Sequence, residues 1–515
     1  MTTGSLQRDG FVVADRPEPG TPRPYDFPSV SRAQLDNGLT ILVADLPGRP
    51  LVSATVVLPT GAADEPAAEG GAAVLAARAL TEGTNRYDAI ELTEASERLG
   101  ASLHAEAGWD ATSIGLDVPS ARLAPALELL AEVLLQPTFP ASEVERLRDE
   151  RLNDLLQAQA DPRRRADETF IGTIYAPASP YHRPAAGLRD TVENLDDAGL
   201  RRAYERALDP VRATLVVAGD LGGQDVVALA RDLLGDWTAR AGVASDRGVV
   251  VDTPAGAERI VRVVHRPGSV QTEIRIGHVG LPRLIPDFHA VSVMSAILGG
   301  LFNSRLNMQL REAKGYTYGA GAGFDMRRGA GPFTARAAVN TEVTVPAVLD
   351  TLAELGRMRD TPVAADELAA ARDFLVGVFP LRFETPGAVV GALSGLAVHG
   401  LPIEELVDYR ARIEAVDIDA IGAAARAHLD VDRAAVVLVG DVDAFGAELE
   451  AAGLGRIVID RDEAPHAAGP LAEADVAVAA VDEGDETGPT AGAEDPDLPG
   501  TADDPTAADV TSREG

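Results

Sequence analysis

An internal repeat is the feature that most restricts how this chain can fold. Residues 209–220 (DPVRATLVVAGD) reappear as residues 430–441 (DVDRAAVVLVGD), 221 positions later. Each copy is an apolar, β-branched run that ends in Gly-Asp, a pattern typical of a buried strand. A second pair of matching segments, 141–149 and 365–373, is offset by 224 positions. Two matches at nearly the same offset indicate that the chain contains a duplicated domain.

The length of the chain agrees with a duplication. Its 515 residues suit two domains of about 200 residues with additional segments. We divide the chain into a flexible N-terminal segment (1–24), a first domain (25–240), a linker (241–258), a second domain (259–461) and an acidic tail (462–515). The linker contains Gly, Pro and Asp, as interdomain segments commonly do.

The order of predicted elements indicates the α+β class. In the first copy, strands are grouped as hairpins and helices follow in a separate group, which favours an antiparallel-rich sheet with helices packed on one face. The second copy is expected to repeat this arrangement. The pattern predicts strands at 39–44, 51–58, 102–107 and 112–118, helices at 71–80, 89–99 and within 121–207, and a closing strand at 214–219.

Composition excludes several classes of function. The chain has no cysteine, which rules out disulfides, thiolate metal sites and thiol nucleophiles. Its net charge is −34, of which −14 lies in the tail. The residues before the tail are therefore also strongly acidic, which argues against nucleic-acid binding. The tail has few large apolar residues and is expected to be disordered. No apolar stretch is long enough for a membrane span or a signal peptide, so a cytoplasmic location without membrane attachment is expected.

A group of short motifs resembles one peptidase family. Gly61-x-x-x-Glu65-Pro66 precedes a predicted helix that ends in Gly83-Thr84, and this resembles the insulinase, pitrilysin and mitochondrial processing peptidase family of zinc metallopeptidases. The resemblance covers about residues 25–459, and implies that the two domains form half of a clamshell. Further matching motifs are Leu35-Asp-Asn-Gly38, Phe139-Pro-x-x-x-Val-Glu-Arg146, Asp161-Pro162 and Ser179-Pro-Tyr-His-Arg-Pro184.

The resemblance also locates a zinc motif that has lost its ligands. Active members carry His-x-x-Glu-His on this helix and a carboxylate on a later one, which together hold zinc. Here those positions are Val74, Ala77 and Arg78, with Asp154 as the later one. Val and Ala have no donor atom and Arg is a cation, so we expect this chain to bind no metal. We hypothesise that Arg78 pairs with Asp154 in place of zinc, and that the lone His104 has a packing role.

A second family motif is intact in the second copy. In the family, an Arg and a Tyr seven residues later orient the bound peptide and stabilise the developing oxyanion, and Arg311 and Tyr318 have this spacing. Without the resemblance, both residues have a purely structural explanation. Arg311 would stabilise the last turn of a helix through the helix dipole, and Tyr318 would be the first residue of a strand. Extended peptides also bind by adding a strand to a sheet edge, and residues 318–324 are a candidate edge.

These features together lead to a functional hypothesis. The chain resembles the Arg/Tyr-bearing, non-catalytic subunit of a bacterial heterodimeric peptidase. The resemblance implies a peptide substrate and a homologous partner subunit that carries His-x-x-Glu-His and the zinc. The alternative is a non-enzymatic scaffold or assembly subunit from the same family. A self-sufficient peptidase would require metal ligands that the sequence lacks.

Overall fold

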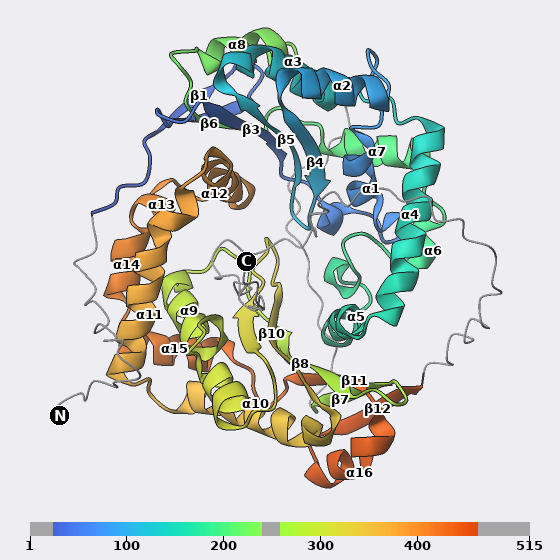
Figure 1. The fold of residues 1–515 in the computed structure, drawn as a ribbon, viewed down its shortest axis with the longest axis vertical. Helices are drawn as coiled ribbons and strands as arrows, with labels where there is room; N and C mark the ends of the chain where they lie inside the picture. The colour runs from blue at the N-terminus through green and yellow to red at the C-terminus, as the bar shows by residue number, and fades with distance from the viewer. Residues whose placement is uncertain (1–23, 239–257, 462–515) are drawn as a thin grey trace, which may run out of the picture.

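The computed structural model describes residues 24–238 and 258–461. The predicted N-terminal segment, linker and acidic tail therefore lie outside the described residues, except for residues 24 and 258. The described residues form two similar α+β halves, and each half has its own six-stranded sheet. Figure 1 shows the two sheets at opposite ends of the molecule, with helices on their outer sides and two helices, α5 and α12, between them. The predicted α+β duplication is confirmed.

The two sheets share one strand order, apart from the outermost strand at one edge. The first is ordered β1-β2-β6-β3-β5-β4 and the second β12-β7-β11-β8-β10-β9. β1 pairs antiparallel with β2, whereas β12 pairs parallel with β7. Neither of these two outer strands is among the strands predicted from the sequence. The strands are β1 (Val30–Gln34), β2 (Thr40–Asp45), β3 (Leu51–Leu58), β4 (Ser102–Ala107), β5 (Thr112–Pro119), β6 (Thr214–Gly219), β7 (Ile260–His265), β8 (Gln271–Val279), β9 (Ala320–Phe324), β10 (Pro332–Asn340), β11 (Ala435–Gly440) and β12 (Arg456–Arg461).

Local capping explains why the helix predicted at 89–99 begins and ends at these residues. Asp88 accepts a hydrogen bond from Glu91 N–H, and Gly100 ends the same helix with a φ of 65°. The helices of the first half are α1 (Ala72–Ala79), α2 (Ala89–Leu99), α3 (Leu123–Leu135), α4 (Ala141–Ala160), α5 (Pro162–Ile174), α6 (Arg189–Val192), α7 (Asp197–Ala207) and α8 (Val226–Leu234). Those of the second half are α9 (Phe288–Ser295), α10 (Thr344–Asp360), α11 (Ala365–Val378), α12 (Pro386–His399), α13 (Glu404–Val407), α14 (Tyr409–Ala415), α15 (Ile418–His428) and α16 (Val442–Ala452).

Each half lends one helix to the sheet of the other half. α5, from the first half, packs on β7, β8 and β11, while α12, from the second half, packs on β3 and β6. Phe170 and Ile174 of α5 share an apolar cluster with Val437 of β11. Because these helices cover the second face of each sheet, β6 and β11 are buried on both sides, which accounts for their unbroken apolar sequence. The sequence predicted helices on only one face of each sheet. The structure shows that the exchanged helices α5 and α12 cover the other face as well.

The loop between β9 and β10 joins the two halves further. The backbone N–H of Arg328 donates to Asp110 at 2.7 Å, and its guanidinium donates to Asp64 at 2.6 Å. The hydroxyl of Tyr175 donates to the carbonyl of Ala330 at 2.9 Å. These bonds connect residues of the two halves and help to hold the described chain in one arrangement.

A half-buried histidine, His289, predicts how stability depends on pH. Burial lowers the pKa of His289 to about 4, although Glu405 opposes the shift. Its ring lies 5.8 Å from that of Tyr409. Below the ordinary histidine pKa of roughly 6.5, the unfolded chain takes up a proton that the folded chain excludes. The free energy of unfolding should therefore fall as pH drops from about 6.5 to 4, by roughly 2–3 kcal/mol from this residue.

Urea titrations at pH 7 and pH 4.5 measure this contribution. His289→Gln should remove about 2 kcal/mol of the pH dependence. His104→Gln, a change at an exposed histidine of β4, is the control and should leave the dependence as it is. Equal pH dependence in the wild type and His289→Gln would show that His289 is not the responsible group.

No helix in the described parts of the chain combines the length and apolar character that a membrane span requires.

Candidate functional site

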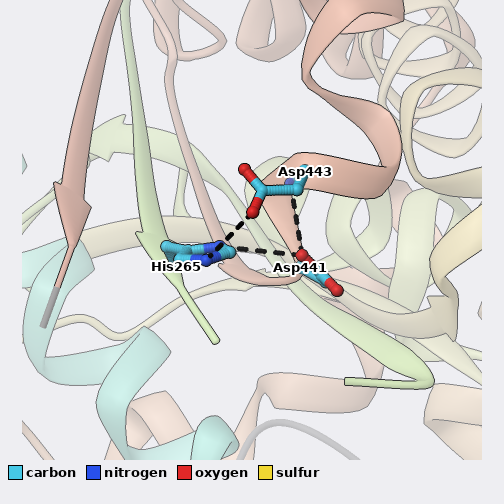
Figure 2. Close-up of side chains that lie close together, drawn as sticks. All are labelled: His265, Asp441 and Asp443. Carbon is cyan, nitrogen blue, oxygen red and sulfur yellow. Dashed lines mark hydrogen bonds and ion pairs between the residues drawn. The ribbon is translucent and has the colours of Figure 1, made fainter. Parts of the chain in front are cut away.

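One group of side chains in the described residues is close enough to be tested as a metal site. His265, at the end of β7, lies near Asp441 and Asp443 at the start of α16 (Figure 2). Nδ1 of His265 accepts a hydrogen bond from Val442 N–H at 3.2 Å. A metal on Nε2 would require a proton on Nδ1, which would abolish that bond. Asp443 also pairs with Arg461 at 3.0 Å, which places a cation beside the group.

The first half shows what this group does instead. There, Asp45 occupies the place of His265 and its Oδ1 accepts a hydrogen bond from Leu221 N–H at 3.2 Å. Asp441 accepts from Gly268 N–H, as Asp220 accepts from Gly48 N–H in the first half. The same turn is thus closed twice by different acceptors. These side chains secure a turn, and the hydrogen bonds and the ion pair that already occupy them argue against a metal ion at this position.

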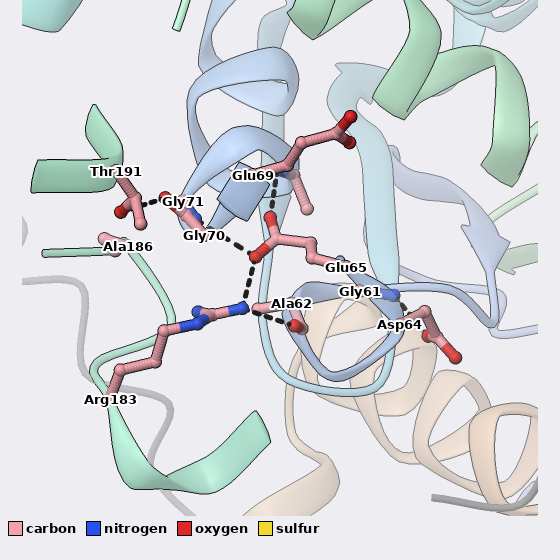
Figure 3. Close-up of polar contacts among 12 residues, drawn as sticks. Gly61, Ala62, Asp64, Glu65, Glu69, Gly70, Gly71, Arg183, Ala186 and Thr191 are labelled. Carbon is pink, nitrogen blue, oxygen red and sulfur yellow. Dashed lines mark hydrogen bonds and ion pairs between the residues drawn. The ribbon is translucent and has the colours of Figure 1, made fainter. Parts of the chain in front are cut away.

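The helix of the degenerate zinc motif, α1, is held by a buried ion pair at its start. Glu65 accepts hydrogen bonds from Gly71 N–H at 3.0 Å and Ala73 N–H at 2.5 Å. Arg183 donates to Glu65 at 2.6 Å and to the carbonyl of Ala62 at 3.1 Å (Figure 3). The two charged side chains are 3% and 9% exposed. Burial raises the pKa of Glu65, and the charge of Arg183 opposes this. Glu65 therefore caps α1 and fixes its direction.

α1 carries the three motif positions as predicted. Val74 is half-buried, Ala77 is buried and Arg78 is exposed. Val74 and Ala77 offer no donor atoms, and the guanidinium of Arg78 donates to Glu150 of α4 at 2.8 Å. The residues at these positions do not fit a zinc ion, and we derive no catalytic step from a metal held here.

The hypothesised pairing of Arg78 with Asp154 is wrong. Both oxygens of Asp154 are bound by other arginines: Arg164 of α5 donates to them at 2.7 and 3.0 Å, and Arg151 pairs with one of them. The hydrogen bond from Arg164 lowers the pKa of Asp154. Arg78 instead reaches Glu150, one helical turn before Asp154 on α4. The carboxylate that remains at the ligand position is thus part of the packing of α4 against α5.

The Arg311–Tyr318 motif lies on an irregular segment before β9. Arg311 belongs to the π-helical segment Asn307–Ala313, and its guanidinium lies 4.6 Å from the centre of the Phe302 ring. Tyr318 is 94% exposed and precedes β9 by two residues, so it does not open the strand itself. Gly315, with a φ of 64°, makes the turn between them. Because π-helical turns and fully exposed aromatic rings are uncommon, this segment is a candidate binding surface.

β9 is at the edge of its sheet, as predicted, but its outer side is covered. Asp325 N–H bonds to Pro332 across the hairpin, so the backbone groups of Ala320 and Ala322 point away from β10. The side chain of Asn307 accepts the hydrogen bond from Ala320 N–H at 2.8 Å. The π-helical segment Ala296–Gly300 lies against Ala322. The candidate edge at 318–324 is therefore not open to an added strand, and that expectation is corrected.

Gly299 makes this close approach possible. A Cβ at position 299 would lie 2.1 Å from the backbone nitrogen of Ala322. Gly299→Ala should therefore destabilise the protein by about 1–3 kcal/mol, since the backbone of β9 would have to shift. Gly321→Ala is a matched control, because a Cβ there meets no atom closer than 3.5 Å. Thermal unfolding compares the two variants, and equal melting temperatures would contradict this assignment.

Three residues that support the site, Glu65, Phe302 and Asn307, were not predicted from the sequence to do so. Glu65 was noted only as part of a motif, yet it caps α1 across five intervening residues. The sequence did contain an indication of this role, since a carboxylate shortly before a glycine-rich helix start is a candidate cap. Asn307 and Phe302 carried no such signal, because their roles depend on contacts with β9 and Arg311.

Comparisons with known families agree with the fold and the motifs. A family model described as "Insulinase (Peptidase family M16)" matches residues 40–178. A second, described as "Peptidase M16 inactive domain", matches residues 194–375. Together they cover most of the described chain.

Individual relatives have low sequence identity to this chain, but the similarity covers most of the length of each relative. An uncharacterised zinc protease of Mycobacterium tuberculosis is 25% identical over 79% of this chain and 92% of its own. The non-peptidase homolog YmxG of Helicobacter pylori is 22% identical over 72% and 84%.

Solved structures share the fold. The crystal structure described as a peptidase M16 inactive domain from Pseudomonas fluorescens superimposes with a TM-score of 0.74 at 24% identity, over 80% of this chain and 98% of its own. A protease from Helicobacter pylori gives a TM-score of 0.75 at 19% identity, over 81% and 100%. With its duplicated sheets, its motifs and both family models in agreement, the chain belongs to the insulinase family of peptidases, M16.

Proposed function

We propose that this chain is the non-catalytic, peptide-binding subunit of a cytoplasmic heterodimeric zinc metallopeptidase. Its partner would be a homologous subunit that carries His-x-x-Glu-His, and the partner's zinc would supply the activated water. The observation that carries the proposal is the contrast between the two motifs. The metal positions hold Val74 and Ala77, whereas Arg311 and Tyr318 are kept on an accessible segment.

The role of this chain follows from the donors that it presents. A guanidinium and a phenol both donate hydrogen bonds to an oxygen that gains negative charge, and neither requires a metal. Phe302 lies under the guanidinium of Arg311 and restricts its movement. The hydroxyl of Tyr318 is reachable by a peptide because its side chain is almost completely exposed. In the complex, the two groups would orient the peptide carbonyl.

The names of the relatives do not distinguish a peptide-binding subunit of a peptidase from a non-enzymatic scaffold subunit, since they include zinc proteases and a non-peptidase homolog. Reconstitution decides between them. The full chain is mixed with a homologous subunit that bears His-x-x-Glu-His, and an internally quenched unstructured peptide reports hydrolysis. We expect no hydrolysis by this chain alone and chelator-sensitive hydrolysis by the mixture, faster than the partner achieves by itself. A stable complex that hydrolyses no peptide would instead support a scaffold subunit.

A further inference from the structure

β12, the last strand of the second half, lies at the edge of its sheet beside β7 (Figure 1). Arg456 N–H donates to the carbonyl of Arg259 at 3.0 Å, and β12 runs parallel to β7 from this point. Because only every second residue of a strand bonds to the same neighbour, the N–H and C=O groups of Ile457 and Ile459 point away from β7. Among the described residues, these outward groups have no backbone hydrogen-bond partner.

The side chains of β12 make this edge suited to burial. Ile457, Val458 and Ile459 follow one another in the strand, and Ile459 is 41% exposed. β1, the equivalent edge strand of the first half, instead exposes a serine, an arginine and a glutamine. Strand edges that combine free backbone groups with apolar side chains tend to pair with another strand. β12 is therefore the outer strand at which such a pairing would bury apolar surface.

The order of the side chains along β12 indicates which strand pairs with it. We propose that β12 pairs antiparallel with β12 of a second copy of this chain, with Val458 opposite its own equivalent. This register places Ile457 opposite Ile459 of the second copy, and Arg456 opposite Asp460 of the second copy. Each of these contacts occurs twice, because a two-fold axis relates the copies. Ile457 and Ile459 supply the interface hydrogen bonds, since their backbone groups point outward.

The neighbouring registers lack this complementarity. The outward backbone groups can meet those of a second copy only if the strands shift by two residues at a time. A shift of two residues in either direction places a charged residue, Arg456 or Asp460, opposite Val458. Opposite charges and apolar pairs across two strands stabilise their pairing, whereas a charge opposite an apolar residue does not. The sequence RIVIDR is therefore complementary to itself in one antiparallel register.

The charges at this edge also permit the contact. Arg262 of β7 donates to Asp460 at 2.6 Å, and the Asp460 side chain is still 32% exposed. A carboxylate accepts several hydrogen bonds, so Asp460 can also accept one from Arg456 of the second copy. β12 itself carries two arginines and one aspartate, although the whole chain has a net charge of −34. Repulsion between distant charges of the two copies is screened beyond about 8 Å at physiological ionic strength.

Sedimentation velocity with the full chain, in the absence of any other subunit, tests the proposal. We expect a reversible dimer at roughly 10–100 µM chain, because one strand pair forms a small interface. Ile459→Pro removes an outward N–H that the ladder with β7 does not use, and proline is tolerated at such edge positions. This substitution should raise the Kd of the dimer by about ten-fold or more.

An exchange of charges tests the register itself. Arg456→Asp and Asp460→Arg each place like charges opposite one another at both ends of the strand pair, so each variant alone should stay monomeric. An equimolar mixture of the two variants should form a heterodimer, because opposite charges then face each other at both ends. Native mass spectrometry detects it from the different masses of the variants. Arg433→Asp, at a side chain that is 63% exposed outside β12, is the matched control and should dimerise like the wild type.

Every other outcome overturns the proposal. A wild-type chain that remains monomeric at about 100 µM would refute the dimer. A dimer that withstands Ile459→Pro would use another surface, and charge variants that associate no better together than alone would exclude the register. Equal losses with Arg433→Asp and Arg456→Asp would show a general effect of charge. These measurements involve no His-x-x-Glu-His subunit, so their failure would leave the proposed function untouched.

Discussion

Arg183→Met should destabilise the protein by about 3–5 kcal/mol, because it leaves the buried carboxylate of Glu65 without a counter-charge. Glu65 would still receive two backbone hydrogen bonds from the start of α1. Those bonds only partly offset the cost of a charge in a site where 3% of the side chain is exposed. Urea denaturation at pH 7 measures the change in the free energy of unfolding.

A neighbouring ion pair provides the matched control. Arg206 pairs with Glu69 at 2.6 Å, and Glu69 is only four residues after Glu65 in the sequence. The side chain of Arg206, however, is 36% exposed. Arg206→Met should therefore cost no more than about 1 kcal/mol. If the two variants lost similar stability, burial would not be the reason for the effect of Arg183. A Glu65→Gln, Arg183→Met double variant should recover part of the loss, because no charge then remains buried.

In the reconstituted heterodimer, Arg311→Ala and Tyr318→Phe should each lower kcat by about 100-fold, the usual effect of losing one oxyanion donor. The KM for the peptide should change far less, because the donors act mainly when charge develops on the carbonyl. Stopped-flow or steady-state hydrolysis of the quenched peptide gives both constants. Neither substitution should alter the stability of the chain appreciably, since Tyr318 is almost fully exposed.

Tyr316→Phe is the matched control for this prediction. It removes the same hydroxyl group two residues away, from a half-buried ring that packs at the border of the second core. We expect less than a two-fold change in kcat. Unchanged turnover in Arg311→Ala and Tyr318→Phe would refute the role assigned to this pair and favour a scaffold function.

Local sequence information was sufficient for the elements and for the duplication. The buried strands β6 and β11 were predicted from their unbroken apolar runs, and the helix predicted at 89–99 is α2. These features depend on side chains that are close in sequence, so periodicity and capping encode them directly. The loss of metal chemistry at Val74 and Ala77 was equally readable, because a side chain without donor atoms cannot bind zinc in any fold.

The ion-pair partners of the charged side chains could be identified only from the tertiary structure. Arginine is long enough to reach any of several carboxylates, and packing brings α5 beside α4, so Arg164 takes Asp154 and leaves Glu150 to Arg78.

The accessible surface of each edge strand was likewise decided in three dimensions. The repeat made the two sheets alike, and an edge position was predicted for β9. Only the folded chain showed that Asn307 and Gly299 cover β9 while, among the described residues, the outer edge of β12 stays open. The sequence by itself determined the duplicated α+β halves and the missing ligands, because those follow from local pattern and chemistry. The tertiary structure decided the ion pairs, the exchanged helices and the open edge, because these depend on which distant segments pack together.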